Sequence, residues 1–173
     1  TEPPPTPKPD LTFVYLNIDT PIEEGNAIEV MTRYKNIGDD IVQNKDIAVK
    51  LTVKDHNSDI KYESITSNLM SYLSLQAEFS LTITIPGDIL LPDDYTVDLE
   101  LDHVDVVDEK DETNNTTTGS LVVTEPPPTP KPDLTFVYLN IDTPIEEGNA
   151  IEVMTRNKNI GDDIVQNKDI AVK

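Results

Sequence analysis

The chain contains one long segment twice. Residues 124–173 repeat residues 1–50 with a single difference, Tyr34 in the first copy against Asn157 in the second. The offset of 123 residues (124 − 1) makes residues 51–123 the remainder of one repeating unit. A period of this length corresponds to a whole domain and exceeds the unit of a solenoid. The near-identity predicts a tandem array, an organisation common in stalks, fibres and adhesins and uncommon in enzymes.

Each copy begins with the proline-rich segment TEPPPTPKP. Proline fixes φ and has no N–H donor, so this segment is expected to be neither a helix nor an inner strand. It predicts a semi-rigid polyproline II rod with a rise of about 3.1 Å per residue. A peptide ligand for SH3-like or WW domains is the alternative, but the recurrence of the segment with the domain favours a linker. The structural prolines of the first linker are Pro3, Pro4, Pro5, Pro7 and Pro9. The expected organisation is a linker at 1–9, a complete domain at 10–123, a second linker at 124–132 and an incomplete second domain at 133–173.

Between the linkers, apolar residues alternate with polar ones, which is typical of β-strands. No segment has a convincing helical period. Residues 66–76 are ambiguous and predict a loop or one helical turn. The pattern predicts an all-β fold, an immunoglobulin-like antiparallel β-sandwich of about seven strands. The expected strands are residues 10–18, 27–36, 46–55, 60–65, 77–85, 94–102 and 116–123.

Two tyrosines carry specific structural expectations. Tyr34 lies on the predicted inward face of its strand with Ile28, Val30 and Thr32. Because a buried amide without partners costs about 1–3 kcal/mol, Asn157 indicates either that this position is at the rim of the sandwich or that the second copy is weaker. Tyr95 follows Pro92-Asp93-Asp94, which resembles a tyrosine corner, although an ordinary buried tyrosine gives the same pattern.

The charge of the chain excludes several classes of partner. The net charge is −20 at pH 7, with 33 acidic and 13 basic residues. This excess argues against nucleic acid, whose binding depends on neutralising phosphates, and against anionic membranes, while it attracts cations. The sequence has no cysteine, so disulfides and thiolate chemistry are excluded. No apolar run approaches the ~20 residues of a membrane span, so direct membrane insertion is not expected.

An acidic loop before the last strand is the one segment with candidate site chemistry. Calcium takes about six to eight oxygen ligands, although the spacing here is not that of an EF-hand. A solvated acidic turn with local side-chain hydrogen bonds is the alternative. The sequence Asn114-Asn115-Thr116-Thr117 adds two overlapping glycosylation sequons, at Asn114 and Asn115. The candidate calcium ligands are Asp102, Asp105, Asp108, Glu109, Asp111 and Glu112.

Catalytic patterns are not found. The two histidines, His56 and His103, lie in predicted turns beside acids. No serine occupies a glycine-framed strand-to-helix turn, and two histidines without metal-ligand spacing make a zinc site improbable. The sequence therefore predicts a protein that is not an enzyme and that has no cofactor other than calcium.

Several residues, taken in order, resemble a known family. The domain opens with Pro9-Asp10-Leu11, its second strand ends with Lys35-Asn36-Ile37-Gly38, and a later strand ends with Asp102. The acidic loop then supplies Glu109, Glu112 and the Asn114-Asn115 pair. This order is similar to that of CARDB, the cell-adhesion-related domain of bacteria and archaea, and the segment 59–76 is longer than that family leads one to expect. The resemblance implies an immunoglobulin-like sandwich in extracellular tandem arrays, without catalysis.

The second copy stops inside its third predicted strand. Its strands lack a partner sheet, which leaves Ile151, Val153 and Val172 without a core. Either the chain continues, or another chain supplies the missing strands by strand exchange. The expected partners are therefore neighbouring copies of the repeat, in cis or in trans. The favoured function is a non-catalytic structural module of a surface fibre, stalk, filament or adhesin. The alternative is an adhesive module that binds carbohydrate or protein with the help of calcium.

Overall fold

The computed structural model describes residues 3–141, 143–144 and 146–164. The chain divides into two compact units, residues 1–126 and residues 127–173. The expectation for Val172 lies outside the described residues. The described part of the chain holds no helix that is long and apolar enough to span a membrane.

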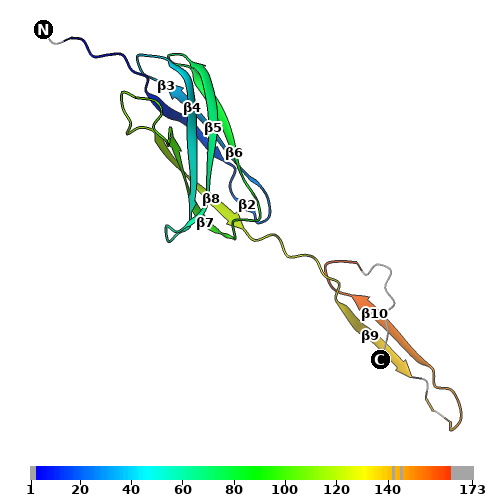
Figure 1. Cartoon of the computed structure of the whole chain (residues 1–173). Helices are drawn as coiled ribbons and strands as arrows, with labels where there is room; N and C mark the ends of the chain where they lie inside the picture. The colour runs from blue at the N-terminus through cyan, green and yellow to red at the C-terminus, as the bar shows by residue number, and fades with distance from the viewer. Residues whose placement is uncertain (1–2, 142, 145, 165–173) are drawn as a thin grey trace. The chain divides into compact units, whose positions relative to one another are not determined.

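The first unit is a β-sandwich of two sheets (Figure 1). Its strands pair in antiparallel fashion, apart from the short β2, which runs parallel to β8. The three-stranded sheet has the order β1 (Leu11–Ile18), β3 (Ile28–Asn36), β6 (Glu78–Ile85). The five-stranded sheet has the order β2 (Ile22–Glu23), β8 (Thr116–Thr124), β7 (Asp93–Leu101), β4 (Val42–Lys54), β5 (Ile60–Leu73). The all-β sandwich predicted from the alternation is confirmed.

The core lies between the two sheets and follows the predicted faces. Along β3, buried residues alternate with exposed or half-buried ones, and the four residues expected to face inward are all buried. The same alternation recurs in β7, where Tyr95, Val97, Leu99 and Leu101 are buried. Period-two burial is what a strand shows when one face of its sheet is covered.

Position 34 is not at the rim of the sandwich. Tyr34 is fully buried, and its ring centroid lies 5.3 Å from that of Phe79 on β6. Burial raises the pKa of Tyr34 above its ordinary value. Of the two explanations for Asn157, a rim position is therefore wrong for the complete repeat.

The ambiguous segment 66–76 is mostly strand. β5 continues to Leu73, because β4 already begins at Val42 and pairs with it along this whole length, from Val42↔Leu73 to Lys54↔Ile60. The expected strands 46–55 and 60–65 were both too short. The reason is that β5 lies at a sheet edge, where apolar residues such as Leu69 point to solvent and the alternation is blurred.

Tyr95 opens β7 at the point where the chain turns into the five-stranded sheet. Its hydroxyl donates a hydrogen bond to the carbonyl oxygen of Leu91, four residues upstream, at 2.8 Å. This is the contact by which a tyrosine corner ties a side chain to the backbone that precedes its strand.

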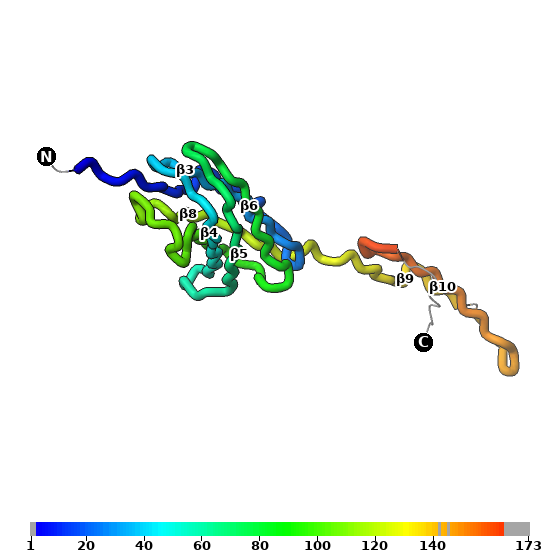
Figure 2. The backbone as a smooth tube through the Cα atoms, turned by 45° about the horizontal axis from the view of Figure 1, so that its top comes forward, coloured from blue at the N-terminus to red at the C-terminus, as the bar shows by residue number. Residues whose placement is uncertain are grey.

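The two ends of the sandwich in the first unit serve different connections. Figures 1 and 2 show residues 3–9 reaching one end of the sandwich and β8 leaving at the opposite end. The linker residues Pro3, Pro4, Pro5 and Pro7 are exposed, and Pro9 is half-buried.

The second unit contains an antiparallel hairpin of β9 (Leu134–Ile141) and β10 (Val153–Asn159). Its register, Leu134↔Asn159, reproduces the Leu11↔Asn36 pair of the first unit. Val153 is 52% exposed and Ile151 is 55% exposed, whereas Val30, the counterpart of Val153, is completely buried. Asn157 is exposed in this hairpin.

Candidate functional site

Most residues behind the family resemblance meet at the end of the sandwich where the first linker arrives. Residues 8–11 of the linker and of β1 contact the turn at 36–40 and the loop at 109–115. We call this set of contacts the N-terminal anchor. Its role follows from the individual hydrogen bonds.

Asn36, the last residue of β3, is at the centre of the anchor and is completely buried. Its side-chain oxygen accepts hydrogen bonds from the amides of Asp10 and Gly38, both at 3.1 Å, and its Nδ2 donates to the carbonyl of Asp40 at 2.8 Å. One side chain thereby closes the turn after β3 and joins it to the start of β1. A buried amide with all these partners stabilises the fold, whereas an unpaired one destabilises it.

The last carbonyls of the linker are also paired. The carbonyl of Lys8 accepts hydrogen bonds from the amides of Asp39 at 2.8 Å and Asp40 at 3.2 Å. The carbonyl of Pro9 accepts one from the amide of Lys110 at 2.9 Å. A proline-rich segment has few donors, so its attachment must come from amides of neighbouring loops.

Gly38 allows the linker to approach this closely. A Cβ atom at Gly38 would lie 2.5 Å from the carbonyl oxygen of Lys8 and from the amide nitrogen of Asp10. Both atoms belong to backbone that the anchor holds in place, so neither can move aside easily. The glycine of the Lys-Asn-x-Gly signature is therefore required by the crossing of two backbones.

Glu109 reaches into the anchor from the acidic loop. Its carboxylate accepts hydrogen bonds from the amide of Leu11 and, at 3.1 Å, from Nδ2 of Asn115. Glu112 accepts the amide of Glu109 at 2.9 Å and so fixes the loop. Removal of the carboxyl from water raises the pKa of Glu109 to about 7, although the two hydrogen bonds oppose this shift.

Asn114 completes the anchor. Its Nδ2 donates to the Asp10 carboxylate at 2.8 Å, and its carbonyl accepts the hydroxyl of Thr12 at 3.2 Å. Two ion pairs cover the outside, Lys8 with Asp108 and Lys110 with Asp39. Exposed pairs of this kind contribute little to stability, because water and salt screen them.

A smaller set of contacts holds the chain where it leaves the domain. The amide of Glu24 donates to the carbonyl of Thr124 at 2.9 Å, and the amide of Val122 donates to the hydroxyl of Thr20 at 2.8 Å. The parallel pairing of Ile22 with Val123 lies between them. We call these contacts the C-terminal anchor.

The second unit repeats part of the N-terminal anchor. Asn159 occupies the place of Asn36, and its side-chain oxygen accepts the amides of Asp133 at 2.9 Å and Gly161 at 3.0 Å. The amide of Asp162 donates to the carbonyl of Lys131 at 3.2 Å. All of these bonds join residues within 131–163 of the described chain, so they form from local sequence.

The six expected calcium ligands are not brought together. Asp102 is buried and accepts the amides of Val106 at 3.2 Å and Val107 at 2.8 Å, while Glu109 points into the anchor. Asp111 accepts the amide of Thr113, and Asp108 points to solvent beside Lys8. Among the described residues of this loop, no three side-chain ligand atoms lie close enough together to hold an ion. The loop uses several of its carboxylates, that of Glu112 included, as hydrogen-bond acceptors that shape it, while Asp105 takes part through its backbone amide, which donates to the carbonyl of Asp102 at 2.7 Å.

The two sequons are engaged as well. Nδ2 of Asn114 is bonded to Asp10, and Asn115 is buried with its Nδ2 bonded to Glu109. A glycan would have to be attached at these same nitrogen atoms. In the folded domain both of these nitrogen atoms are therefore occupied by hydrogen bonds, and glycosylation at either sequon remains an expectation from the sequence.

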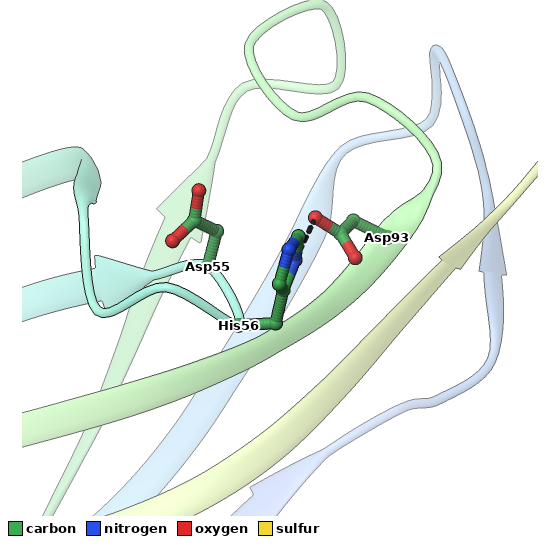
Figure 3. Close-up of side chains that lie close together, drawn as sticks. All are labelled: Asp55, His56 and Asp93. Carbon is green, nitrogen blue, oxygen red and sulfur yellow. Dashed lines mark hydrogen bonds and ion pairs between the residues drawn. The ribbon is translucent and has the colours of Figure 1, made fainter.

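One group of possible metal ligands was not expected from the sequence. Asp55, His56 and Asp93 lie at the ends of β4 and β7, and their ligand atoms are all within 4.8 Å of one another (Figure 3). Nδ1 of His56 is 3.0 Å from the Asp93 carboxylate. His56 and Asp93 are 37 positions apart in the sequence, which leaves no spacing signal, because only the pairing of β4 with β7 brings them together.

The Asp55 carboxylate already has three partners. It accepts the amides of Asn57 and Asp59, both at 2.9 Å, and pairs with Lys61 at 2.9 Å. The ion pair with Lys61, helped by the two amides, lowers the pKa of Asp55 to about 2. These contacts make the Asp55 side chain part of a closed turn. A cation at this group would have to displace Lys61 from the Asp55 carboxylate.

The close approach of the linker backbone to Gly38 gives a first prediction. Replacement Gly38→Ala should lower the free energy of unfolding by about 2–3 kcal/mol, at the upper end for single substitutions, because the added methyl meets fixed backbone. Urea unfolding followed by circular dichroism measures this loss. The matched control is Gly119→Ala, whose Cβ would meet only side-chain atoms of Leu16 and Ile18, at 3.0 Å. Equal losses in the two variants would contradict the requirement at Gly38.

Glu109 generates a prediction about pH. A raised pKa means that the folded state favours the neutral carboxyl, so the contribution of this group to stability is present below its ordinary pKa of 4.5 and is lost as the pH rises to about 7. In Glu109→Gln this loss of stability with rising pH should disappear, because the glutamine side chain does not ionise. The stability of the variant relative to the wild type should increase with pH across this range, by up to about 1.4 kcal/mol per pH unit. Unfolding curves from pH 4 to 8 test it, and a carboxyl NMR titration of Glu109 with a midpoint near 4.5 would contradict it.

Comparison with known proteins identifies one family. The profile of the CARDB family matches residues 8–119, which begins at the linker residue that the anchor holds. The comparison with curated proteins found no match.

One solved structure supports the fold, and two others are similar at lower scores. A crystal structure of a CARDB domain from Pyrococcus furiosus, in complex with di-metal ions, shares 21% identity, covers 69% of this chain and 96% of that chain, and has a TM-score of 0.53. The solution structure of that domain covers 69% and 98% at 21% identity, with a TM-score of 0.49. A domain from Methanosarcina acetivorans, of a protein provisionally named a cell surface protein, shares 19% identity over 68% of this chain and 94% of its own, with a TM-score of 0.45. Since the family profile spans more than half of its residues, the chain belongs to the CARDB family.

Proposed function

We propose that this chain is a structural repeat module of an extracellular stalk, fibre, filament or adhesin, and that it acts as a spacer. The module consists of one sandwich with a linker held at each end. The observation that carries the proposal is that hydrogen bonds of the folded domain extend into both linkers.

The two kinds of anchor leave a short free segment between successive domains. The C-terminal anchor holds the chain up to Thr124, and the bond from Asp162 holds it again from Lys131. Residues 125–130, EPPPTP, lie between these points and include four prolines. In polyproline II conformation six residues span roughly 19 Å, and such a segment bends little over this length. The anchors of the folded domains therefore reduce the free part of the linker to its proline-rich centre, which is its stiffest part.

The positions of the linkers support the same role. Within the first unit they attach at opposite ends of the sandwich (Figure 1). Each sandwich then adds its own length to an array. The net charge of −20 disfavours non-specific association between crowded copies, because like charges repel at distances up to about a Debye length.

The stiffness of the linker can be measured. The chain has no cysteine, so spin labels can be placed through Val104→Cys and Met154→Cys, at exposed positions in the two units. We expect double electron–electron resonance to give a narrow distribution of the distance between the two labels. Substitution of the prolines in 126–130 by glycine should broaden it and shift it to shorter distances, because glycine restores a flexible coil.

The matched control replaces Pro3, Pro4, Pro5 and Pro7 by glycine. These positions have the same local sequence but do not lie between the labels. Their replacement should leave the distribution unchanged. If glycines in 126–130 have no effect either, the spacer proposal is wrong.

An adhesive module that binds a ligand through a metal is the second candidate. The convergence of Asp55, His56 and Asp93 is the local observation in its favour, and the P. furiosus domain noted above is described with di-metal ions. We expect millimolar Ca²⁺ and equimolar Zn²⁺ to leave the melting temperature of the chain unchanged, since Lys61 already neutralises Asp55. A rise in melting temperature that EDTA reverses and that Asp93→Asn abolishes would favour the adhesive function instead.

A further inference from the structure

β5 has a free edge. It is the last strand of the five-stranded sheet, and over its 14 residues it pairs with β4 on one side (Figure 2). In the described residues, no strand pairs with its other side. Unpaired N–H and C=O groups along such an edge can bind another strand, and natural proteins usually block this with charge, proline or a bulge.

These protections are missing from most of β5. Residues 64–77 form the longest uncharged stretch of a chain that carries 46 charged residues (33 + 13), and they contain neither proline nor glycine. Elsewhere the acidic surface opposes the approach of a second copy. This edge is where two copies can meet without like-charge repulsion.

The exposed apolar side chains of β5 are arranged symmetrically about one residue of the strand. Ile65 is 58% exposed and Leu69 is 73% exposed, and both lie on the outer face of the sheet with Ser67 midway between them. Side chains two and four residues apart share a face of a strand. The edge therefore presents an apolar pair that is symmetric about Ser67.

We propose that two copies of the chain associate through their β5 edges, antiparallel, with a two-fold axis at Ser67. In this register Ile65 of each copy lies opposite Leu69 of the other, so two aliphatic cross-strand pairs flank the Ser67 pair, one on each side, on the same face of the continuous sheet. Glu63 lies opposite Ser71, and Lys61 lies opposite Leu73, so no two charges of the same sign face each other. The two five-stranded sheets become one sheet that crosses the interface.

The choice of a second copy as the occupant rests on charge and symmetry. An oppositely charged partner would be drawn to the acidic surfaces of the chain and not to its uncharged edge. By contrast, only a contact between two copies related by a two-fold axis requires a strand edge that is complementary to itself. This inference goes beyond the spacer function, since it concerns lateral association of copies and not their spacing along a chain.

Cysteine cross-linking tests the register. The two-fold axis places Ser67 opposite its own counterpart, with Cα atoms about 4.5–5.5 Å apart, within reach of a disulfide. Ser67→Cys in the full chain should therefore form a disulfide-linked dimer under mild oxidation, seen on a non-reducing gel. The matched control is Ser71→Cys, on the same strand and also exposed to solvent. In the proposed register its counterpart lies eight residues along, or roughly 27 Å away. It should remain monomeric.

The effects of salt and of a charge introduced at the β5 edge test whether two copies associate there. Sedimentation of the wild-type chain at high concentration should show a dimer whose fraction increases with salt, because salt screens the repulsion between the two acidic copies. Leu69→Lys should abolish this dimer. Leu91→Lys, at a loop position that is 66% exposed, makes the same change of charge and should keep it.

A monomeric wild type, a dimer that survives Leu69→Lys, or equal cross-linking of the two cysteine variants would each overturn the proposal. The last two results would place any association on another surface.

Discussion

The structure depends on how a proline-rich segment can be bound to a folded domain. Prolines offer carbonyls but no amide donors, so the linker cannot join a sheet, and the domain must supply amides and polar side chains to it. The amides of Asp39, Asp40 and Lys110 donate to the last linker carbonyls. The buried side chains of Asn36 and Glu109 accept the first amides after the linker, those of Asp10 and Leu11. Their hydrogen bonds set where β1 begins and hence how the three-stranded sheet aligns with the core. The sandwich and the linker are therefore parts of one folded unit.

This view also explains the residues that resemble the family pattern. Pro9-Asp10-Leu11, Asn36, Gly38, Glu109 and Asn114-Asn115 are far apart in sequence but contact one another at one end of the sandwich. Their contacts hold a chain in place, which is the property that a spacer needs. The uncharged edge of β5 lies in the other sheet and gives the module a separate means of lateral contact.

Much of the fold could be predicted, because period-two burial is a local property of each strand. The predicted faces of β3 and β7 are correct for this reason. The acidic loop could not be interpreted in the same way, since composition does not tell whether Asp102 and Glu109 point outward to an ion or inward to backbone amides. The Asp55–His56–Asp93 group was missed because two loops that are distant in sequence meet at one end of the sandwich. β5 was predicted too short, because an edge strand buries only part of one face.

The repeated segment separates local from tertiary determinants. The same residues form the same hairpin twice, with the register Leu11↔Asn36 in one unit and Leu134↔Asn159 in the other, and the asparagine bonds the same two amides each time. Strand positions, turn and asparagine-centred contacts are thus set by local sequence. Burial is not: Val30 is completely covered and its counterpart Val153 is 52% exposed. Only β4 to β8, packed across the hairpin, remove that side chain from water, because the hydrophobic effect acts on surface that another layer covers.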